Sequence, residues 1–316
     1  MRSPEHTSIA FIGTGVMGAP MAGHLLDAGY ALTVYNRTAS RADALVARGA
    51  VRATSPAEAV AQADVVITMV GYPADVEAVY LGADGIIEAA KPGTLLIDMT
   101  TSSPALAERI ATEAAARGLR ALDAPVSGGD VGAKNATLTI MVGGDAESFD
   151  AAKPVLHVMG ANVVRQGGSG CGQHTKMANQ VAIAGCMLGT VESLAYATSA
   201  GLDPRTVLES IGAGSAASWS LANLAPRILD GNFAPGFYVK HFVKDMRIAM
   251  NSAEEMGLDL PGLTAAKRLY ELLETSGGEN LGTQALWLLY ADEAARERAG
   301  VARGASTVAA RAVAGL

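Results

Sequence analysis

Residues 8–18 read SIAFIGTGVMG, and this stretch decides the fold. Residues 8–12 form a short apolar run that predicts a buried strand, and residues 15–28 carry the pattern of a helix. Glycines at the junction allow a tight turn, close approach of the backbone to a diphosphate and close packing of helix on strand. The helix N-terminus offers free N–H groups to the same diphosphate. We therefore predict a dinucleotide-binding loop; a glycine-rich turn without a ligand is the alternative. Its expected cofactor-contacting residues are Gly13, Thr14, Gly15, Val16, Met17 and Gly18.

The rest of the N-terminal half alternates short apolar runs with helical patterning. Further strands are expected at residues 31–35, 65–70, 94–99 and 137–142. Short apolar strands separated by helices predict βαβ units and a doubly wound parallel sheet, covered on both faces.

The pattern changes after residue 163. Residues 166–170 form a polar, glycine-rich hinge, and the following sequence has helical periodicity with no convincing strand. Residues 173–200 predict one long helix, and the pair Asp203 and Pro204 predicts the start of another. We expect a Rossmann-like α/β domain over residues 1–167 and an all-helical domain over residues 168–316.

Composition excludes several classes of protein. The chain has 316 residues, of which half are hydrophobic, and a net charge of −7. An acidic chain lacks the basic surface that nucleic acids require. The apolar run at residues 181–191 is shorter than the roughly 20 residues of a membrane span, and the first eight residues are polar. Two cysteines, Cys171 and Cys186, suit a reducing compartment. We expect a soluble cytoplasmic protein with no nucleic-acid or membrane partner.

The end of the second expected strand indicates which dinucleotide binds. NAD-selective folds carry an acidic residue there, which binds the ribose 2′-hydroxyl. This chain has Asn36, Arg37 and Thr38 instead. A guanidinium at Arg37 can pair with a 2′-phosphate, Asn36 and Thr38 can add hydrogen bonds, and Arg41 is a second possible cation. The residues favour NADP over NAD, unless Arg37 is only a solvated surface charge.

Four ordered motifs resemble the β-hydroxyacid dehydrogenase family, which includes 3-hydroxyisobutyrate dehydrogenases and tartronate semialdehyde reductases. The resemblance extends from Phe11 to about Ala249. The motifs are GTGVMGAPMA at residues 13–22, DAPVSGG at residues 123–129, the segment 170–180 around Lys176, and KDM at residues 244–246. Residues 85–99 look most like the reductase branch. His24 stands where the first motif usually has Asn, and we expect little consequence.

Lys176 is the expected catalytic residue. Hydride transfer to a carbonyl leaves an alkoxide, and an ammonium beside it can stabilise the charge and donate a proton. In the oxidative direction the neutral amine acts as the base, and burial between the domains would favour that form. The resemblance implies the same role. Asn179 and Gln180 follow at helical spacing on one face, where they either orient the substrate and the lysine or form hydrogen bonds within the core.

Three further segments complete the expected site. Ser127, Gly128 and Gly129 follow a strand and can form a cradle for the substrate carboxylate, although a plain turn has the same sequence. Val70 ends another strand over the cofactor. The resemblance implies that Thr101 contacts the cofactor near the nicotinamide ribose and that Lys244 reaches it from the helical domain. We assign no metal ligands.

These residues together predict an NADP-dependent oxidoreductase that interconverts a small β-hydroxy acid and its semialdehyde. The acid is of the 2-hydroxy-3-oxopropionate or the 3-hydroxyisobutyrate type. An imine reductase and a non-catalytic NADP-binding protein are the alternatives, and the presence of Lys176 argues against both. We also expect a homodimer or homotetramer that assembles through the helical domain.

Overall fold

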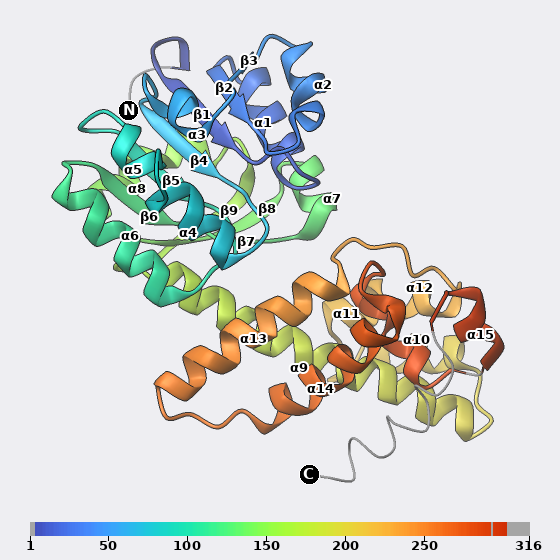
Figure 1. Ribbon diagram of the computed structural model, residues 1–316. Coiled ribbons are helices and arrows are strands. Elements are labelled where there is room, and N and C mark those ends of the chain that lie inside the picture. Colours follow the sequence, from blue (N-terminus) through green and yellow to red (C-terminus); the bar gives the residue numbers. More distant parts are fainter. Residues whose placement is uncertain (1–3, 292, 302–316) are drawn as a thin grey trace. The chain divides into compact units, whose positions relative to one another are not determined.

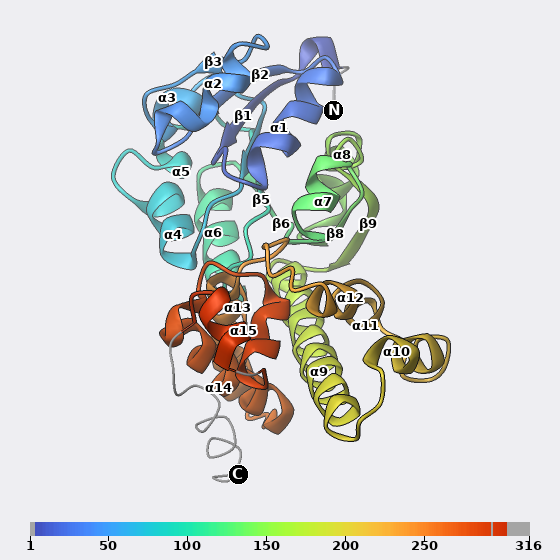
Figure 2. The same ribbon diagram turned by 90° about the vertical axis from the view of Figure 1, so that its right-hand side faces the viewer.

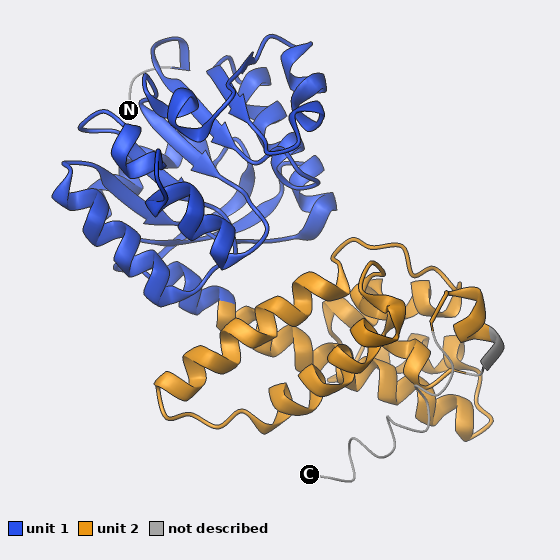
Figure 3. Cartoon of the chain, in the orientation of Figure 1, with its two compact units in different colours: residues 1–176 blue, residues 177–316 orange. Residues whose placement is uncertain are grey.

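The computed structural model describes residues 4–291 and 293–301. The chain divides into two compact units, residues 1–176 and residues 177–316 (Figure 3). The division falls inside the long helix α9 (Cys171–Ser199), nine residues after the domain boundary expected from the sequence.

Unit 1 is built on a nine-stranded sheet in the order β3-β2-β1-β4-β5-β6-β8-β7, with β9 paired to β8 (Figure 1). The strands are β1 (Ser8–Ile12), β2 (Ala31–Tyr35), β3 (Val51–Arg52), β4 (Val65–Thr68), β5 (Leu95–Asp98), β6 (Arg120–Asp123), β7 (Val126–Ser127), β8 (Leu138–Gly143) and β9 (Gly160–Gly167). The first six strands along this order are parallel, and β8 runs antiparallel to β6 and β7. The expected α/β fold class is confirmed, but the sheet is mixed because its last strands reverse.

Helices cover both faces of the sheet, as Figure 1 shows. They are α1 (Gly18–Asp27), α2 (Asp43–Val46), α3 (Pro56–Val60), α4 (Pro73–Leu81), α5 (Ile86–Ala89), α6 (Pro104–Ala116), α7 (Gly129–Lys134) and α8 (Ala146–Leu156), with 3₁₀ turns η1 (Pro4–His6) and η2 (Ala39–Ala42). Along β1, Ile9 and Phe11 pack with α1 and α8, whereas Ala10 and Ile12 pack with α3 to α6. Alternate residues of each central strand thus enter different cores, which explains why these strands are apolar throughout.

Strand order places the candidate cofactor site. β1 lies between β2 and β4. Strands β2 and β3 extend the sheet on one side of β1, and β4, β5 and β6 extend it on the other, so the strand order reverses at β1. Ligands of open α/β sheets bind at such a reversal point, outside the carboxyl ends of the strands. The glycine loop after β1 therefore stands at the expected place.

Unit 2 is helical in its described residues. It contains most of α9, followed by α10 (Pro204–Gly212), α11 (Trp219–Asn223), α12 (Ala225–Leu229), α13 (Val239–Glu255), α14 (Pro261–Leu273), η3 (Glu274–Gly278), η4 (Thr283–Leu289) and α15 (Glu293–Arg298). Figure 2 shows α9 between the α10–α12 segment and the α13–α14 segment in that view. Asp203 caps α10 through a hydrogen bond from Arg205 N, as the sequence predicted. Residues 219–229 form two short helices, α11 and α12, rather than one continuous helix.

Helix α9 is longer and more apolar than the run recognised in the sequence. By length and composition alone it could cross a membrane. One face, however, forms the core of unit 2 through Met177, Ala184, Met187, Val191 and Leu194. This spacing of three, four and seven residues is that of a helix packed on its neighbours, and it gives the apolar composition a structural reason.

Candidate active site

The loop between β1 and α1 requires glycine at two of its three glycine positions. Gly13 has a φ of +98°, and a Cβ atom on it would collide with the carbonyl oxygen of Met69. A Cβ atom on Gly18 would collide with the carbonyl oxygen of Gly13. Among the described residues, a Cβ atom on Gly15 would meet only Arg41 Nη1, at 3.8 Å. Gly15 therefore leaves an open surface on the loop.

The same loop has polar groups that a dinucleotide would satisfy. The hydroxyl of Thr14 is buried and has no hydrogen-bond partner within the described part of the chain. Helix α1 begins at Gly18 after Met17, and Met17 provides no side-chain cap for the helix N–H groups. Val16 is 54% exposed beside them. An open glycine, an unpartnered hydroxyl and an uncapped helix N-terminus fit a bound diphosphate.

The segment after β2 is tied to the glycine loop. The side chain of Asn36 accepts a hydrogen bond from Thr14 N at 2.9 Å and donates one to Thr38 O at 2.9 Å. Asn36 thus holds the loop with its amide. The Arg37 side chain is 87% exposed and lies 3.2 Å from Asp75 Oδ1, an ion pair that solvent weakens. With Arg41 beside Gly15, two guanidinium groups border this part of the site.

The ends of β4 and β5 are joined by buried hydrogen bonds. Val70 N donates to Thr100 Oγ1 at 3.0 Å, and Thr100 N donates to Asp98 Oδ1 at 3.1 Å. Thr68 Oγ1 donates to the same Asp98 oxygen at 2.6 Å. This network fixes the position of Val70 and of the segment that continues into Thr101, which is half-buried.

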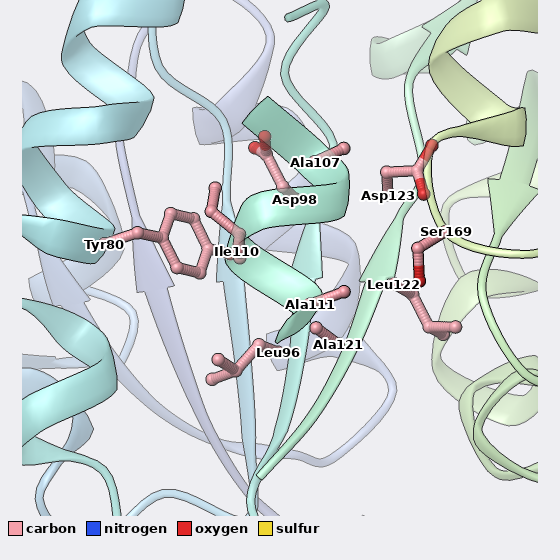
Figure 4. Close-up of a pocket in the computed structure, with 10 residues that line it drawn as sticks. All are labelled: Tyr80, Leu96, Asp98, Ala107, Ile110, Ala111, Ala121, Leu122, Asp123 and Ser169. Atoms are coloured by element: carbon pink, nitrogen blue, oxygen red, sulfur yellow. The ribbon is translucent and has the colours of Figure 1, made fainter. Parts of the chain in front are cut away.

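Two buried carboxyl groups lie beneath these strand ends. Asp98 and Asp123 are paired positions of β5 and β6, and both line a cavity of about 10 Å³ (Figure 4). Burial raises the pKa of Asp98 to about 6, although hydrogen bonds from Thr68 and Thr100 act against it. Burial likewise raises the pKa of Asp123, against hydrogen bonds from the backbone of Gly170 and Gln173. A cavity of this size has room for about one water molecule.

The expected carboxylate cradle follows β7. Ser127 ends that strand, and Gly128 and Gly129 have φ values of +130° and +62° at the start of α7. His24 of α1 lies at the other end of α7, with Nε2 3.1 Å from Ala133 O and 3.0 Å from Lys134 O. His24 therefore links the glycine-loop helix to the helix that follows the cradle.

Lys176 lies in the second turn of α9 and is 6% exposed. The first turn of the same helix is held by Asp123, which accepts hydrogen bonds from Gly170 N and Gln173 N at 2.8 Å each. Lys176, Asp123, the glycine loop and the cradle all belong to unit 1. A buried lysine in the unit that carries the cofactor loop is suited to proton transfer.

The remaining expected residues form a polar cluster in unit 2. Asn179 Nδ2 donates to Gln180 Oε1 at 2.8 Å, and Gln180 Nε2 donates to Asp245 Oδ2 at 2.6 Å. Lys244 Nζ lies 3.1 Å from Asp245 Oδ1. Gln180 and Asp245 are both buried, and the hydrogen bond between their side chains lies within this unit.

Sequence reasoning missed Gln173 and the part that Asp98 and Asp123 play. Asp98 is a charged residue at the end of an otherwise apolar strand, which is a signal for a buried carboxyl group. Gln173 stands three residues before Lys176, on the same helix face. Its partners are about 70 residues away in the chain, so nothing in the local sequence identifies them.

Comparison with known families covers both units. The model of the NAD binding domain of 6-phosphogluconate dehydrogenase matches residues 8–168. The model described as NAD-binding of NADP-dependent 3-hydroxyisobutyrate dehydrogenase matches residues 170–290. The first match alone covers more than half of the chain.

Similar proteins come from several organisms. An uncharacterized oxidoreductase of Bacillus subtilis, YkwC, is 56% identical over 90% of this chain and 98% of its own length. The probable 3-hydroxyisobutyrate dehydrogenase-like 1 of Arabidopsis thaliana is 50% identical over 90% of this chain and 86% of its own. The solved structure of Mycobacterium tuberculosis 3-hydroxyisobutyrate dehydrogenase with L-serine has a TM-score of 0.84 and 32% identity, over 89% of this chain and 98% of that one.

Two relatives have names that state different activities. A protein of Pseudomonas aeruginosa named NAD-dependent L-serine dehydrogenase is 41% identical over 85% of this chain and 93% of its own. The 2-hydroxy-3-oxopropionate reductase of Escherichia coli is 36% identical over 88% of this chain and 95% of its own. The similarities establish an NAD(P)-dependent oxidoreductase without separating the substrates or the two cofactors.

Proposed function

The chain belongs to the β-hydroxyacid dehydrogenase family, and we propose that it interconverts a small β-hydroxy acid and its semialdehyde with NADP as cofactor. The observation that carries this proposal is the buried Lys176 in the unit that holds the glycine loop. Burying a charged lysine is unfavourable because the ammonium group loses its hydration. A role in proton transfer explains why a lysine stands at this buried position.

Different residues of the chain bind the cofactor, bind the substrate and transfer the proton. Gly13 to Gly18 and the N-terminus of α1 bind the diphosphate. When bound, the nicotinamide supplies or accepts the hydride. Lys176 holds a proton on Nζ and donates it to the carbonyl oxygen during reduction; its neutral amine removes the hydroxyl proton during oxidation. Ser127, Gly128 and Gly129 bind the substrate carboxylate and hold the reacting carbon in place.

The proposal of NADP rests on charge at the end of β2. No carboxylate stands among residues 34–38, and the guanidinium groups of Arg37 and Arg41 border this part of the site. A 2′-phosphate would compete with Asp75 for Arg37, and the exposed Arg37–Asp75 pair is weak enough to be exchanged.

The substrate proposal remains a class, a short β-hydroxy acid. Relatives are named for 3-hydroxyisobutyrate, 2-hydroxy-3-oxopropionate and L-serine, and each of these acids has a carboxylate that the proposed cradle at residues 127–129 would bind. The proposal is tested by incubating the protein with a panel of these acids and of the corresponding semialdehydes and by measuring the formation or consumption of NADPH from its absorbance. We expect turnover with at least one of them. NADPH binding without turnover on any member, or reduction of cyclic imines alone, would contradict it.

The protein is also proposed to be a cytoplasmic homo-oligomer. Its two cysteines are free, which suits a reducing compartment. Tyr196 and Trp219 of unit 2 are 77% and 70% exposed, and α10 contains no buried residue although it is amphipathic. We propose that these side chains belong to one apolar patch, since contiguous exposed apolar patches mark interfaces. Cell fractionation tests the location, and light scattering tests the assembly.

A further inference from the structure

The start of α9 is anchored by a residue far from it in sequence. The two carboxylate oxygens of Asp123, at the end of β6, accept hydrogen bonds from Gly170 N and Gln173 N, 47 and 50 residues further along the chain. Asp123 is 5% exposed. A carboxylate at this position satisfies two free N–H groups and interacts favourably with the helix dipole. The end of a central strand thus sets where α9 begins.

The contact between strand and helix is close. A Cβ atom on Gly172 would lie 2.6 Å from the carbonyl oxygen of Asp123. No side chain fits at position 172 between the first turn of α9 and the end of β6, so the helix has little room to slide along the strand.

Gln173 connects the same turn to the segment after β5. Its Oε1 accepts a hydrogen bond from Ser102 N at 2.9 Å, and its Nε2 donates to Thr100 O at 2.8 Å. The side chain is fully buried. The amide therefore binds the backbone on both sides of Thr101, the residue expected to contact the cofactor.

The segment after β5 is itself held from its other side. Asp98 accepts hydrogen bonds from the backbone and the hydroxyl of Thr100. Thr100 thus donates a hydrogen bond to Asp98 through its N–H group and accepts one from Gln173 through its carbonyl oxygen. Figure 4 shows Asp98 and Asp123 at the ends of adjacent strands, so the two anchoring carboxyl groups lie in one layer of the sheet.

We propose that Asp123 and Gln173 are positioning residues that hold Lys176 at a fixed place relative to the Thr100–Ser102 segment. Gln173 and Lys176 are three residues apart and therefore lie on one face of α9. Any rotation of the first turn that breaks the Gln173 hydrogen bonds also moves Lys176. The inference rests on the proposed function, because it requires Lys176 to act on a substrate near this segment.

The test compares Gln173→Met and Asp123→Asn with Thr175→Ala. The methionine has a similar length but forms neither hydrogen bond to the segment, and the asparagine places a donor against a backbone N–H group. Within the part of the chain that the structure describes, the Thr175 hydroxyl donates a hydrogen bond only to Cys171 O in its own turn, at 2.8 Å, so its alanine variant controls for a local change in the same turn.

Three measurements separate positioning from general stability. We expect kcat to fall at least about tenfold in Gln173→Met and Asp123→Asn, since a displacement of about 1 Å can cost up to about a hundredfold. The Kd for NADPH should change less than kcat does, because the glycine loop that binds the diphosphate is not altered and only the contact expected at Thr101 is loosened. Hydrogen exchange in the free protein should quicken at residues 170–176 and at 100–102 together, and Thr175→Ala should change none of these values.

The outcomes distinguish failure of the inference from failure of the proposed function. Turnover by the wild type together with unchanged kcat in both folded variants would overturn the inference alone. Absence of turnover by the wild type on the substrate panel would overturn the proposed function instead. If Gln173→Met does not fold, Asp123→Asn and the hydrogen-exchange pattern of Thr100–Ser102 decide, and unchanged exchange there contradicts the proposal.

Discussion

At the scale of single residues, the cofactor end of the site depends on two arginines. Arg37 is almost fully exposed and is paired with Asp75, and Arg41 lies beside Gly15. Both side chains are exposed, so packing does not explain why arginine stands at either position. Charge complementarity with the 2′-phosphate of NADP is the function that we propose for both.

Replacing both arginines by alanine should weaken NADPH binding by about 10- to 100-fold, because charge-assisted hydrogen bonds contribute roughly 1.5–3 kcal/mol. The Kd for NADH should change little. Fluorescence titration with each cofactor measures the ratio. Arg109→Ala is the control, because Arg109 is half-exposed and its ion pairs among residues 4–291 and 293–301 are with Glu77 and Glu113. An equal loss for both cofactors would argue against NADP selectivity.

Asp98 makes stability depend on pH. Burial raises its pKa from 3.8 to about 6, so the folded protein retains a proton that the unfolded chain releases. Stability from this group is then fully present below about pH 4 and falls as the pH rises to about 6; the full change is at most roughly 3 kcal/mol.

Asp98→Asn should therefore remove part of the pH dependence. Compared with the wild type, its free energy of unfolding should be relatively higher at about pH 7.5 than at about pH 5, as measured by urea denaturation. The raised pKa of Asp123 acts in the same direction in both proteins, and its charge also raises the pKa of Asp98, so the difference between them reports Asp98 together with its interaction with Asp123. If the free energy of unfolding changed with pH by the same amount in both proteins, Asp98 would not contribute to the pH dependence of stability.

At the scale of elements, two of the three glycines of α9 have opposite surroundings. A Cβ atom on Gly172 would lie 2.6 Å from Asp123 O, whereas one on Gly185 would meet no described atom within 4 Å. Gly172→Ala should lower the free energy of unfolding by about 1–3 kcal/mol through overpacking. Gly185→Ala should raise it by roughly 0.5–1 kcal/mol, because alanine favours a helix. Thermal denaturation of the pair tests both signs, and a loss in Gly185→Ala would indicate that this face is covered.

Sequence patterning located the elements that are apolar and missed those that are not. β1 and β2 have the predicted bounds, and α9 differs from its prediction by two residues at its start and one at its end. β3 and β7 have two residues each, too few to show alternation. β9 is mostly exposed, so it lacks an apolar run, and it includes part of the expected hinge.

For the candidate site, the sequence shows residue types but not long-range partners. Glycines at 13, 15 and 18 and the arginine at 37 follow from local rules of turn geometry and charge. The hydrogen bonds of Asn36, Gln173 and Gln180 join segments between 22 and 73 residues apart. Only the packed structure brings those partners together.

At the scale of the whole molecule, the exposed apolar surface of unit 2 predicts assembly. Light scattering at micromolar concentration should give the mass of a dimer or tetramer rather than that of one 32.2 kDa chain. Tyr196→Ser and Trp219→Ser should shift the mass toward one chain if these side chains lie in the interface. A monomeric wild type would contradict the expected assembly but not the chemistry at Lys176.

The proposed reaction depends on proton transfer by Lys176, and replacing this residue is the sharpest test of it. Steady-state turnover and NADPH affinity of Lys176→Ala are compared with those of the wild type, with Lys153→Ala as the control because that lysine is exposed on α8. We predict that kcat falls by about 10²- to 10⁴-fold, the usual contribution of a proton donor, while the Kd for NADPH is nearly unchanged. Wild-type kcat in folded Lys176→Ala would contradict the proposed mechanism.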